Sequence, residues 1–201
     1  MPTIPQLASK PFDEAREGNH LFLRAWFRAP LRIAALTPSS ATTGATMARL
    51  IDRDRSGPVL DLGAGTGAIG QALLESGLPP GRLIMVEREK ALADHLRKKF
   101  PAIRVVECDA TGLGSALAAR GVRRVAAIAS TLPIVWFSAA AQMAIVDQCF
   151  ALLGEGGSLL QLTNQPASPL PMRKLNLVGE RAAHVWRNLP PSSVWRYRRP
   201  D

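Results

Sequence analysis

The sequence has few cysteines and no long apolar run, and these absences exclude several classes of protein. The spacing of its two cysteines, Cys108 and Cys149, is not that of metal ligands, so we expect neither a zinc site nor a structural disulfide. No apolar run approaches the roughly 18 residues of a membrane-spanning helix. The N-terminus lacks the apolar core and cleavage site of a secretory signal. We therefore expect a soluble or peripheral protein of the cytoplasm, a reducing compartment.

Acidic residues are scarce relative to basic ones. There are 25 lysines and arginines against 16 aspartates and glutamates, which gives a net charge of +9. Such an excess is typical of proteins that bind a polyanion, either nucleic acid or an anionic membrane surface. An arginine-rich proteome would give the same balance without such a partner. With 47% hydrophobic residues, the 201-residue chain can bury one sizeable core and is most simply one domain.

The most informative stretch is Val59–Gly70, with the sequence VLDLGAGTGAIG. It predicts a buried strand over 58–62, a glycine loop, and a helix over 68–76. Three residues of the loop lack a Cβ, so the backbone can turn tightly and lie against a ligand: Gly63, Gly65 and Gly67. The N–H groups at the start of the helix point toward the same ligand. Because residues 65–70 also match the dinucleotide motif G-x-G-x-x-G, the loop alone predicts a nucleotide cofactor without choosing its class.

Three acidic residues at predicted strand ends favour S-adenosylmethionine over a dinucleotide. Asp61 precedes the first glycine by two residues, where its carboxylate can reach a cationic amino-acid portion directly or through water. Glu87 ends the apolar run 83–86, about 20 residues beyond the loop, where an acidic residue accepts hydrogen bonds from ribose hydroxyls. Asp109 suits contact with the adenine amine, although a solvated strand end is the alternative for this residue. Together they resemble the cofactor site of class I S-adenosylmethionine-dependent methyltransferases.

Strands alternate with helices along the rest of the chain. Beyond the glycine loop we expect strands over 83–86, 104–107, 125–129 and 158–162, helices over 41–51, 90–100 and 138–153, and a terminal hairpin over 182–187 and 194–199. This order predicts a parallel sheet with helices on both faces. The fold class is α/β: a single Rossmann-like methyltransferase domain over 37–201, whose mostly parallel seven-stranded sheet ends in an antiparallel hairpin. The hairpin is typical of class I methyltransferases and not of dinucleotide dehydrogenases.

Residues 1–36 are expected to form a mobile arm followed by an amphipathic helix over 12–29. Three arginines recur every fourth residue beside a cluster of aromatic and aliphatic side chains, a pattern typical of a helix in a lipid headgroup layer. The alternative is a helix that packs on the core as a lid over the cofactor. The expected membrane contacts are Leu21, Phe22, Arg24, Trp26, Phe27, Arg28 and Arg32. Further basic residues expected to face acidic headgroups are Arg16, Arg173, Lys174, Arg196, Arg198 and Arg199.

Three groups of residues resemble bacterial phospholipid N-methyltransferases. They are FLRAW at 22–26 with PLR at 30–32 and PSS at 38–40, then STLP at 130–133, and NLPP at 188–191 with Val194. The resemblance covers nearly the whole chain, which departs from the family where it has Thr131 in place of a glycine. It implies N-methylation of phosphatidylethanolamine toward phosphatidylcholine at the inner face of the cytoplasmic membrane. It further implies a monomer that needs no metal and binds no nucleic acid.

The resemblance also implies which residues form the active site. The expected cofactor contacts are Asp61, Gly63, Gly65, Thr66, Gly67, Glu87, Asp109, Ala110 and Ser130. The expected catalytic residues are Ser130, Thr131, Leu132, Pro133 and Tyr197. Backbone carbonyls of 130–132 would hold the amine by its N–H groups. Tyr197, His184 and bulk water all stay open as the proton acceptor. Trp136, Trp195 and Tyr197 either bind the methylammonium by cation–π attraction or are plain core aromatics.

Three other interpretations stay open. An RNA adenine N-methyltransferase would use the positive charge to bind phosphates, although the aromatic residues do not alternate with basic ones as in a stacking platform. A lipid-surface module that binds cofactor without turnover is the second, with Thr131 as its best support. A nicotinamide dehydrogenase is the third, and the terminal hairpin argues against it.

Overall fold

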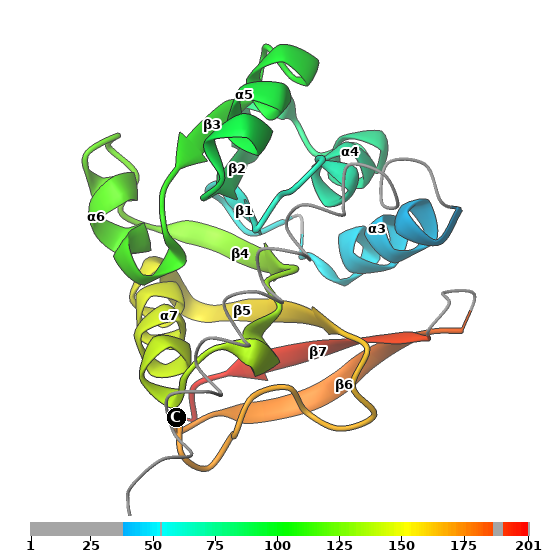
Figure 1. Cartoon of the computed structure of the whole chain (residues 1–201), viewed down its shortest axis with the longest axis vertical. Coiled ribbons are helices and arrows are strands. Elements are labelled where there is room, and N and C mark those ends of the chain that lie inside the picture. The colour runs from blue at the N-terminus through cyan, green and yellow to red at the C-terminus, as the bar shows by residue number, and fades with distance from the viewer. Residues whose placement is uncertain (1–37, 53, 187–190, 201) are drawn as a thin grey trace, which may run out of the picture.

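A mixed seven-stranded sheet forms the centre of the protein. The computed structural model describes residues 38–52, 54–186 and 191–200, and the account that follows concerns these residues. The strands lie in the order β3-β2-β1-β4-β5-β7-β6 (Figure 1). Strands β1 to β5 are parallel, and β7 runs antiparallel to both β5 and β6. The strands are β1 (Val59–Leu62), β2 (Leu83–Glu87), β3 (Arg104–Glu107), β4 (Val125–Ser130), β5 (Leu153–Thr163), β6 (Val178–Val185) and β7 (Ser192–Arg198). The mostly parallel sheet with a terminal hairpin is thus confirmed.

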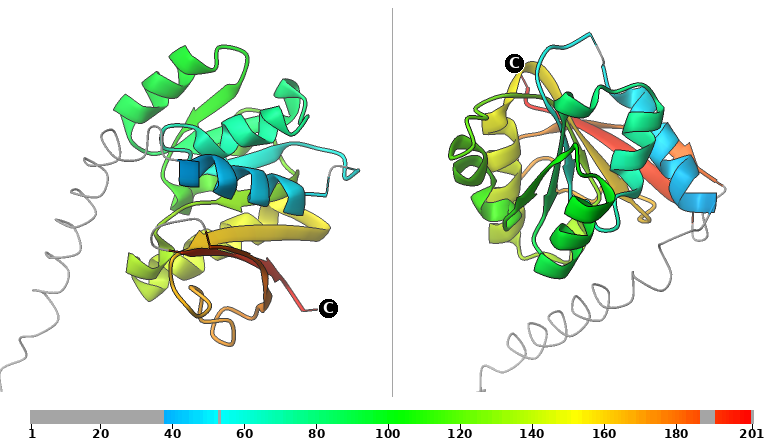
Figure 2. Two further views of the ribbon diagram at one scale, coloured as in Figure 1. Left: turned by 90° about the vertical axis from the view of Figure 1, so that its right-hand side faces the viewer. Right: turned by 90° about the horizontal axis from the view of Figure 1, so that it is seen from above.

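Helices cover both faces of this sheet (Figure 2). The α-helices are α3 (Pro38–Leu50), α4 (Ala68–Glu75), α5 (Lys90–Lys99), α6 (Leu113–Ala118) and α7 (Ala139–Leu152). Helices α3, α4 and α5 share one core cluster with the sheet, and α6 and α7 share the other. Because both faces are covered, every residue of β1, β2 and β4 is buried. This explains why these strands appear in the sequence as continuous apolar runs.

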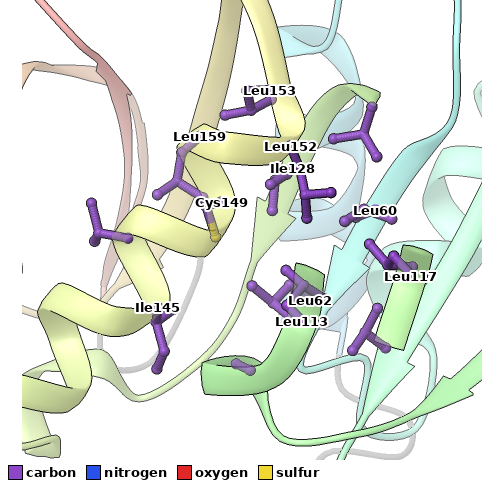
Figure 3. Close-up of a cluster of buried hydrophobic side chains, with 14 of the residues drawn as sticks. Leu60, Leu62, Leu113, Leu117, Ile128, Ile145, Cys149, Leu152, Leu153 and Leu159 are labelled. Carbon is purple, nitrogen blue, oxygen red and sulfur yellow. The ribbon is translucent and has the colours of Figure 1, made fainter. Parts of the chain in front are cut away.

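The core on the α7 face joins the parallel strands to α6 and α7 (Figure 3). Leu60 and Leu62 point to this face because alternate residues of a strand share one side of the sheet. Val59, by the same alternation, belongs to the core on the other face. By the same alternation, Asp61 lies on the face of Val59, which α3, α4 and α5 cover and which is called the α4 face below.

The element boundaries differ from the expected ones mainly in the last three strands. Strand β5 begins at Leu153 and not at 158, because Leu153 already pairs with Val125 before the register shifts within the glycine-rich segment. Strand β6 begins at Val178, which pairs with Arg198 near the end of β7. The short helix α6 was not expected as a separate element. The predicted helix over 12–29 lies outside the described residues. Within the described residues, no helix is long and apolar enough to cross a membrane.

Candidate active site

The glycine loop between β1 and α4 is attached to the end of β2. The N–H groups of Gly63 and Ala64 both donate to the carbonyl of Val86, at 2.9 and 3.0 Å. The N–H of Gly65 donates to Oε2 of Glu87 at 2.9 Å. Gly67 stands at the N-cap of α4 with a φ of 84°, in the left-handed region that favours glycine. The loop is therefore held in one conformation by the strand whose last residue is Glu87.

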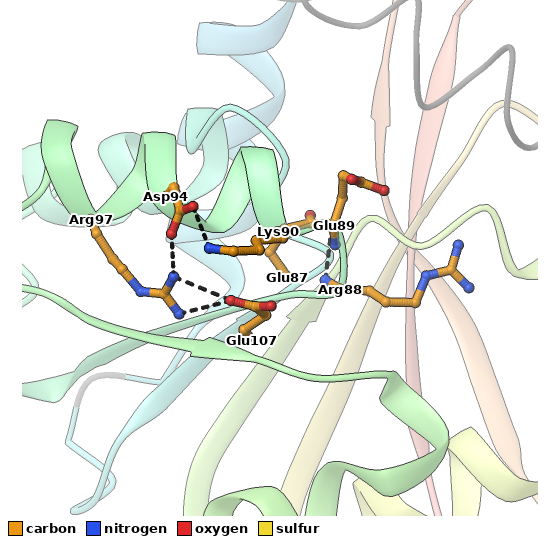
Figure 4. A network of polar contacts seen from close by, with 7 residues as sticks. All are labelled: Glu87, Arg88, Glu89, Lys90, Asp94, Arg97 and Glu107. Carbon is orange, nitrogen blue, oxygen red and sulfur yellow. Dashed lines mark hydrogen bonds and ion pairs between the residues drawn. The ribbon is translucent and has the colours of Figure 1, made fainter.

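The carboxylate of Glu87 is fixed by three backbone N–H groups. Besides the bond from Gly65, its Oε1 accepts hydrogen bonds from Arg88 N at 2.8 Å and Glu89 N at 2.9 Å (Figure 4). The residue is 4% exposed. These three hydrogen bonds fix the orientation of the carboxylate at the carboxyl end of β2. Its expected contact with ribose hydroxyls stays a prediction.

An exposed ion-pair network supports the turn after Glu87. Arg97 on α5 contacts Asp94 at 2.6 Å and Glu107 at the end of β3 at 3.2 Å, and Lys90 contacts Asp94 at 2.7 Å (Figure 4). Hydrogen bonds from Lys90 and Arg97 lower the pKa of Asp94. Since these side chains are exposed, the network contributes little stability. Its consequence is geometric, because Arg97 connects α5 to the end of β3 at Glu107.

Asp61 is fully buried on the α4 face of β1. Its Oδ2 accepts a hydrogen bond of 2.9 Å from the N–H of Gly70. A Cβ at position 70 would lie 3.1 Å from this oxygen and overlap Cε of Met85, so glycine permits the approach. Oδ1 is buried and accepts no hydrogen bond from the described residues. Burial raises the pKa of Asp61 to about 7, partly opposed by the Gly70 hydrogen bond and assisted by the charge of Glu87.

Asp109 lies at the turn after β3, where its Oδ1 accepts hydrogen bonds from N and Oγ1 of Thr111 at 2.9 and 2.7 Å. Its Oδ2 lies 3.4 Å from the guanidinium of Arg88. Partial burial raises the pKa of Asp109, but the Thr111 hydrogen bonds and the Arg88 charge outweigh this effect and hold the pKa below its usual range. Asp109 is therefore an ionised acceptor, as an amine ligand requires.

A cleft opens between the carboxyl ends of β1, β2, β3 and β4. Together with the solvent space at its mouth, the cleft measures about 420 Å³. Five expected site residues line it: Gly63, Glu87, Asp109, Ala110 and Leu132. Six further residues line it: Leu62, Val86, Arg88, Cys108, Phe137 and Ile145. Four of these six directly precede or follow an expected residue in sequence, and Phe137 ends the loop that the sequence places beside the reactive methyl group, whereas nothing in the sequence marks Ile145. Burial raises the pKa of the Cys108 thiol, so this side chain is an apolar wall and not a thiolate.

The loop after β4, residues 130–137, is called the acceptor loop below. Thr131 N donates to the carbonyl of Leu62 at 3.0 Å, and Thr131 Oγ1 donates to the carbonyl of Gly63 at 2.7 Å. Ser130 is 1% exposed, and its Oγ accepts a hydrogen bond from Leu132 N at 3.4 Å. Pro133 caps a 3₁₀ turn over Ile134–Trp136, so regular helix does not form there. The acceptor loop thus packs directly on the glycine loop.

One expected role in the acceptor loop needs correction. The carbonyl of Leu132 already accepts two hydrogen bonds, from Ile134 N at 2.8 Å and from Nε2 of Gln161 at 2.9 Å. Both of its lone pairs are in use, so it does not hold an amine in this conformation. Among the turn and loop bonds between backbone groups of the described residues, in contrast, none goes to the carbonyl of Thr131. The expected contact with the amine therefore falls to Ser130 or Thr131.

The expected catalytic role of Tyr197 is not supported by its position. Its side chain is 0% exposed within the core cluster on the α7 face, and its hydroxyl lies 2.7 Å from Oγ of Ser168. Burial raises the pKa of Tyr197 to about 12, although hydrogen bonds with Ser168 and Leu170 oppose this effect. A buried phenol that already has a partner and holds its proton this tightly does not accept one from a substrate. Tyr197 is a core residue.

The other aromatic and imidazole candidates belong to the hairpin or the acceptor loop. Nδ1 of His184 lies 2.9 Å from Oγ of Ser193, so this imidazole joins β6 to β7. The ring of Trp195 is half-buried, with the guanidinium of Arg181 5.7 Å from its centroid, so a cation already occupies this ring. Trp136 is 44% exposed on the 3₁₀ turn of the acceptor loop. Of these, Trp136 is the one near the site.

Comparison with known proteins agrees with this geometry. A family model described as a methyltransferase domain matches residues 59–157. An ornithine lipid N-methyltransferase of Singulisphaera acidiphila is 31% identical over 180 residues, which cover 87% of this chain and 93% of that protein.

Two solved structures share the fold. Magnesium protoporphyrin IX methyltransferase (ChlM) from Synechocystis PCC 6803 with bound S-adenosylmethionine has a TM-score of 0.67 at 12% identity, over 96% of this chain and all of that one. The glycopeptide N-methyltransferase MtfA in complex with S-adenosylmethionine has a TM-score of 0.61 at 14% identity, over 80% of this chain and 94% of that one.

Proposed function

The chain belongs to the class I S-adenosylmethionine-dependent methyltransferases, and we propose that it methylates the amine of a membrane lipid, with phosphatidylethanolamine and its N-methylated derivatives as acceptors on the way to phosphatidylcholine. The observation that carries a lipid amine as acceptor is the similarity to an ornithine lipid N-methyltransferase over nearly its whole length. That relative itself supports ornithine lipid as the acceptor, whereas the choice of phosphatidylethanolamine rests on the sequence motifs at 22–40, 130–133 and 188–194. Both lipids present a primary amine to the enzyme.

Residues of the cleft, together with the buried Asp61 that directly precedes the lining residue Leu62, suit S-adenosylmethionine. When bound, this cofactor would supply an electrophilic methyl group on a sulfonium, whose carbon a neutral amine would attack as the S–C bond breaks and the thioether S-adenosylhomocysteine leaves. Asp61 has a buried oxygen without a hydrogen-bond partner among the described residues, and it would attract the ammonium of the amino-acid portion. Glu87 and Asp109 line the cleft as acceptors for ribose hydroxyls and for the adenine amine. The three carboxylates therefore fit the three polar portions of the cofactor.

The acceptor loop would align the amine with the methyl group. Catalysis of this kind depends mostly on proximity and orientation, since the displacement is in line. The Thr131 carbonyl would accept an N–H of the amine and thereby orient its lone pair toward the cleft. Because Tyr197 is buried in the core and His184 lies on β6, at the edge of the sheet farthest from the cleft, we assign removal of the ammonium proton to bulk water before the amine binds.

We propose that residues 1–36 place the enzyme on the anionic inner surface of the cytoplasmic membrane. These residues lie outside the described part, so support comes from their sequence and from the net charge of +9. Among the described basic residues, Arg196 pairs with Glu180 and Arg199 with Asp147, and both are less available to headgroups than expected. Arg173, Lys174 and Arg198 are exposed. Binding should strengthen with anionic lipid and weaken with salt.

The experiment is methyl incorporation from labelled S-adenosylmethionine into three parallel acceptors. Vesicles with an anionic lipid contain either phosphatidylethanolamine or ornithine lipid, and total RNA is the third sample. We expect label in phosphatidylethanolamine, and chromatography of the headgroups counts the methyl groups. Label in ornithine lipid alone would show that ornithine lipid, and not phosphatidylethanolamine, is the acceptor. Label in RNA, or cofactor binding without any labelled product, would overturn the lipid assignment.

A further inference from the structure

A buried glutamine connects the acceptor loop to the neighbouring strand. Gln161 on β5 is 1% exposed, and its Cα pairs in register with that of Ser130 at the end of β4. Its Nε2 donates to the carbonyl of Leu132 at 2.9 Å and to that of Leu162 at 2.8 Å. The amide thus joins one carbonyl of its own strand to one carbonyl of the acceptor loop.

The orientation of this amide is determined by its two partners. Both neighbours of Nε2 are carbonyl oxygens, which accept and do not donate. The opposite orientation would place Oε1 against the same two carbonyls, with no donor between them. In the observed orientation Oε1 is buried without a hydrogen-bond partner among the described residues. The hydrogen bonds of the Gln161 side chain among the described residues are therefore those to the carbonyls of Leu132 and Leu162.

Leu132, whose carbonyl Gln161 holds, connects this hydrogen bond to the cleft. Its side chain lines the cleft and packs on the glycine loop, where a Cβ at Gly63 would lie 2.8 Å from Cδ2 of Leu132. Its neighbour Thr131 carries the carbonyl that would accept the amine. A shift of Leu132 would therefore move the acceptor side of the site while the glycine loop, attached to β2, keeps its place.

We propose that Gln161 is a positioning residue for methyl transfer, which aligns the acceptor amine by fixing the carbonyl of Leu132. The inference rests on the proposed function for the identity of the acceptor. Gln161 is buried and its amide N–H groups are bonded to Leu132 and Leu162, so it acts through Leu132 and not on the reacting atoms. Its loss should therefore reduce turnover and raise the KM for the acceptor, with little change in cofactor affinity.

A second buried glutamine provides a matched comparison. Gln142 on α7 is 9% exposed, and its Nε2 donates to the carbonyls of Ile134 at 2.9 Å and Phe137 at 3.2 Å. It therefore makes the same pair of bonds at the far end of the acceptor loop. Gln142→Met and Gln161→Met each remove two hydrogen bonds from a side-chain amide to backbone carbonyls. Only Gln161→Met frees the carbonyl of Leu132, the residue that packs on Gly63.

The test uses the full-length protein and these two variants. For Gln161→Met we expect kcat with lipid vesicles to fall by at least about tenfold, because a displacement of about 1 Å costs up to about 100-fold. The Kd of S-adenosylmethionine, measured by calorimetry, should change by less than about twofold. For Gln142→Met the fall in kcat should stay below about threefold. An unchanged kcat for Gln161→Met, an equal fall in both variants, or a parallel loss of cofactor binding would each overturn the proposal.

A second measurement separates this proposal from the choice of lipid. Amide hydrogen exchange, followed by mass spectrometry with cofactor bound, should be faster over 130–137 in Gln161→Met than in wild type, while residues 63–67 keep their protection. If wild type methylates none of the offered lipids but the exchange changes in this way, the acceptor is wrong and the role of Gln161 stands. If the exchange over 130–137 is unchanged, the role of Gln161 is wrong whatever the acceptor.

Discussion

The hydroxyl of Thr131 donates a hydrogen bond of 2.7 Å to the carbonyl of Gly63, and this bond joins the acceptor loop to the glycine loop. The two residues are 68 positions apart and meet because β1 and β4 are neighbours in the sheet. The N–H of Thr131 adds a second bond to the same segment, at Leu62. The loop that would hold the cofactor and the loop that would hold the amine are therefore joined at Thr131, one residue before the carbonyl that Gln161 holds.

Removal of the Thr131 hydroxyl should separate these two loops. Thr131→Val keeps the shape and loses the donor, whereas Thr131→Ser keeps both the hydroxyl and the bond to Gly63. We expect Thr131→Val to lower the free energy of unfolding by about 1 kcal/mol and kcat by about 2- to 10-fold, in line with one lost hydrogen bond. Denaturant titration and methyl incorporation measure the two effects. Equal behaviour of the two variants would show that the hydroxyl has no such role.

Burial of Asp61 should make stability depend on pH. Its pKa rises from 3.8 to about 7 on folding, so the folded state binds the proton more tightly. The contribution of protonated Asp61 is complete below pH 3.8 and is lost as the pH rises through 7. Asp61→Asn should therefore gain stability relative to wild type over this range, by at most about 4 kcal/mol, and the difference should level off above it. Unfolding midpoints measured across this pH range test this, and parallel curves would contradict it.

The same titration should appear in cofactor binding. Ionised Asp61 attracts the cofactor ammonium, so the Kd of S-adenosylmethionine should fall as the pH rises through about 7 in wild type. The Asp61→Asn protein should bind more weakly and without this dependence. Calorimetry at a series of pH values measures both. A dependence that persists in Asp61→Asn would assign the titration to another group.

The carboxylate of Glu87 should be necessary for cofactor binding. Glu87→Gln removes one of the two oxygens that accept the backbone bonds and replaces it with a donor. We expect the Kd of S-adenosylmethionine to rise by about 10- to 100-fold, since charge-assisted bonds contribute about 1.5–3 kcal/mol each. Glu89→Gln is the control, because it makes the same change of charge on an exposed neighbour and should leave the Kd within about twofold. If both variants bind alike, net charge and not the Glu87 geometry is responsible.

Cys108 should report occupancy of the cleft. It lines the cleft, whereas Cys149 is fully buried in the core. Burial raises the pKa of the Cys108 thiol, so maleimide should react slowly, and S-adenosylhomocysteine should slow it further by covering the side chain. Mass spectrometry of the labelled protein measures the rate, and a Cys108→Ser protein gives the background. Labelling that the ligand does not slow would place the cofactor elsewhere.

Tyr197→Phe should be active. The variant loses the hydrogen bond between the phenol and Ser168, which should lower the free energy of unfolding by about 1 kcal/mol. Its kcat should stay within about twofold of wild type, because the phenol is buried away from solvent. Loss of a general base reduces turnover by about 10²–10⁴-fold. A fall in kcat of that size in Tyr197→Phe would show that Tyr197 is a catalytic residue.

The sequence by itself determined the fold class and the cofactor end of the site. Buried parallel strands appear as continuous apolar runs, and the glycine loop is marked by residues that are close together in the chain. Asp61 lies near the end of a strand, Glu87 ends one and Asp109 follows one by two residues, so all three could be placed near the carboxyl edge without knowing the strand neighbours. These features depend on local sequence, which is why the order of elements and the cofactor class could be predicted.

Only the tertiary structure decided what happens between segments that are distant in sequence. Tyr197 and His184 had the right chemistry for a proton acceptor, but pairing of β7 with β5 and β6 buries the first and attaches the second to Ser193. Gln161 has no motif around it and acquires its role because β5 lies beside β4. The physical reason is that a polar side chain takes its function from the partners it meets, and strand order and register select those partners.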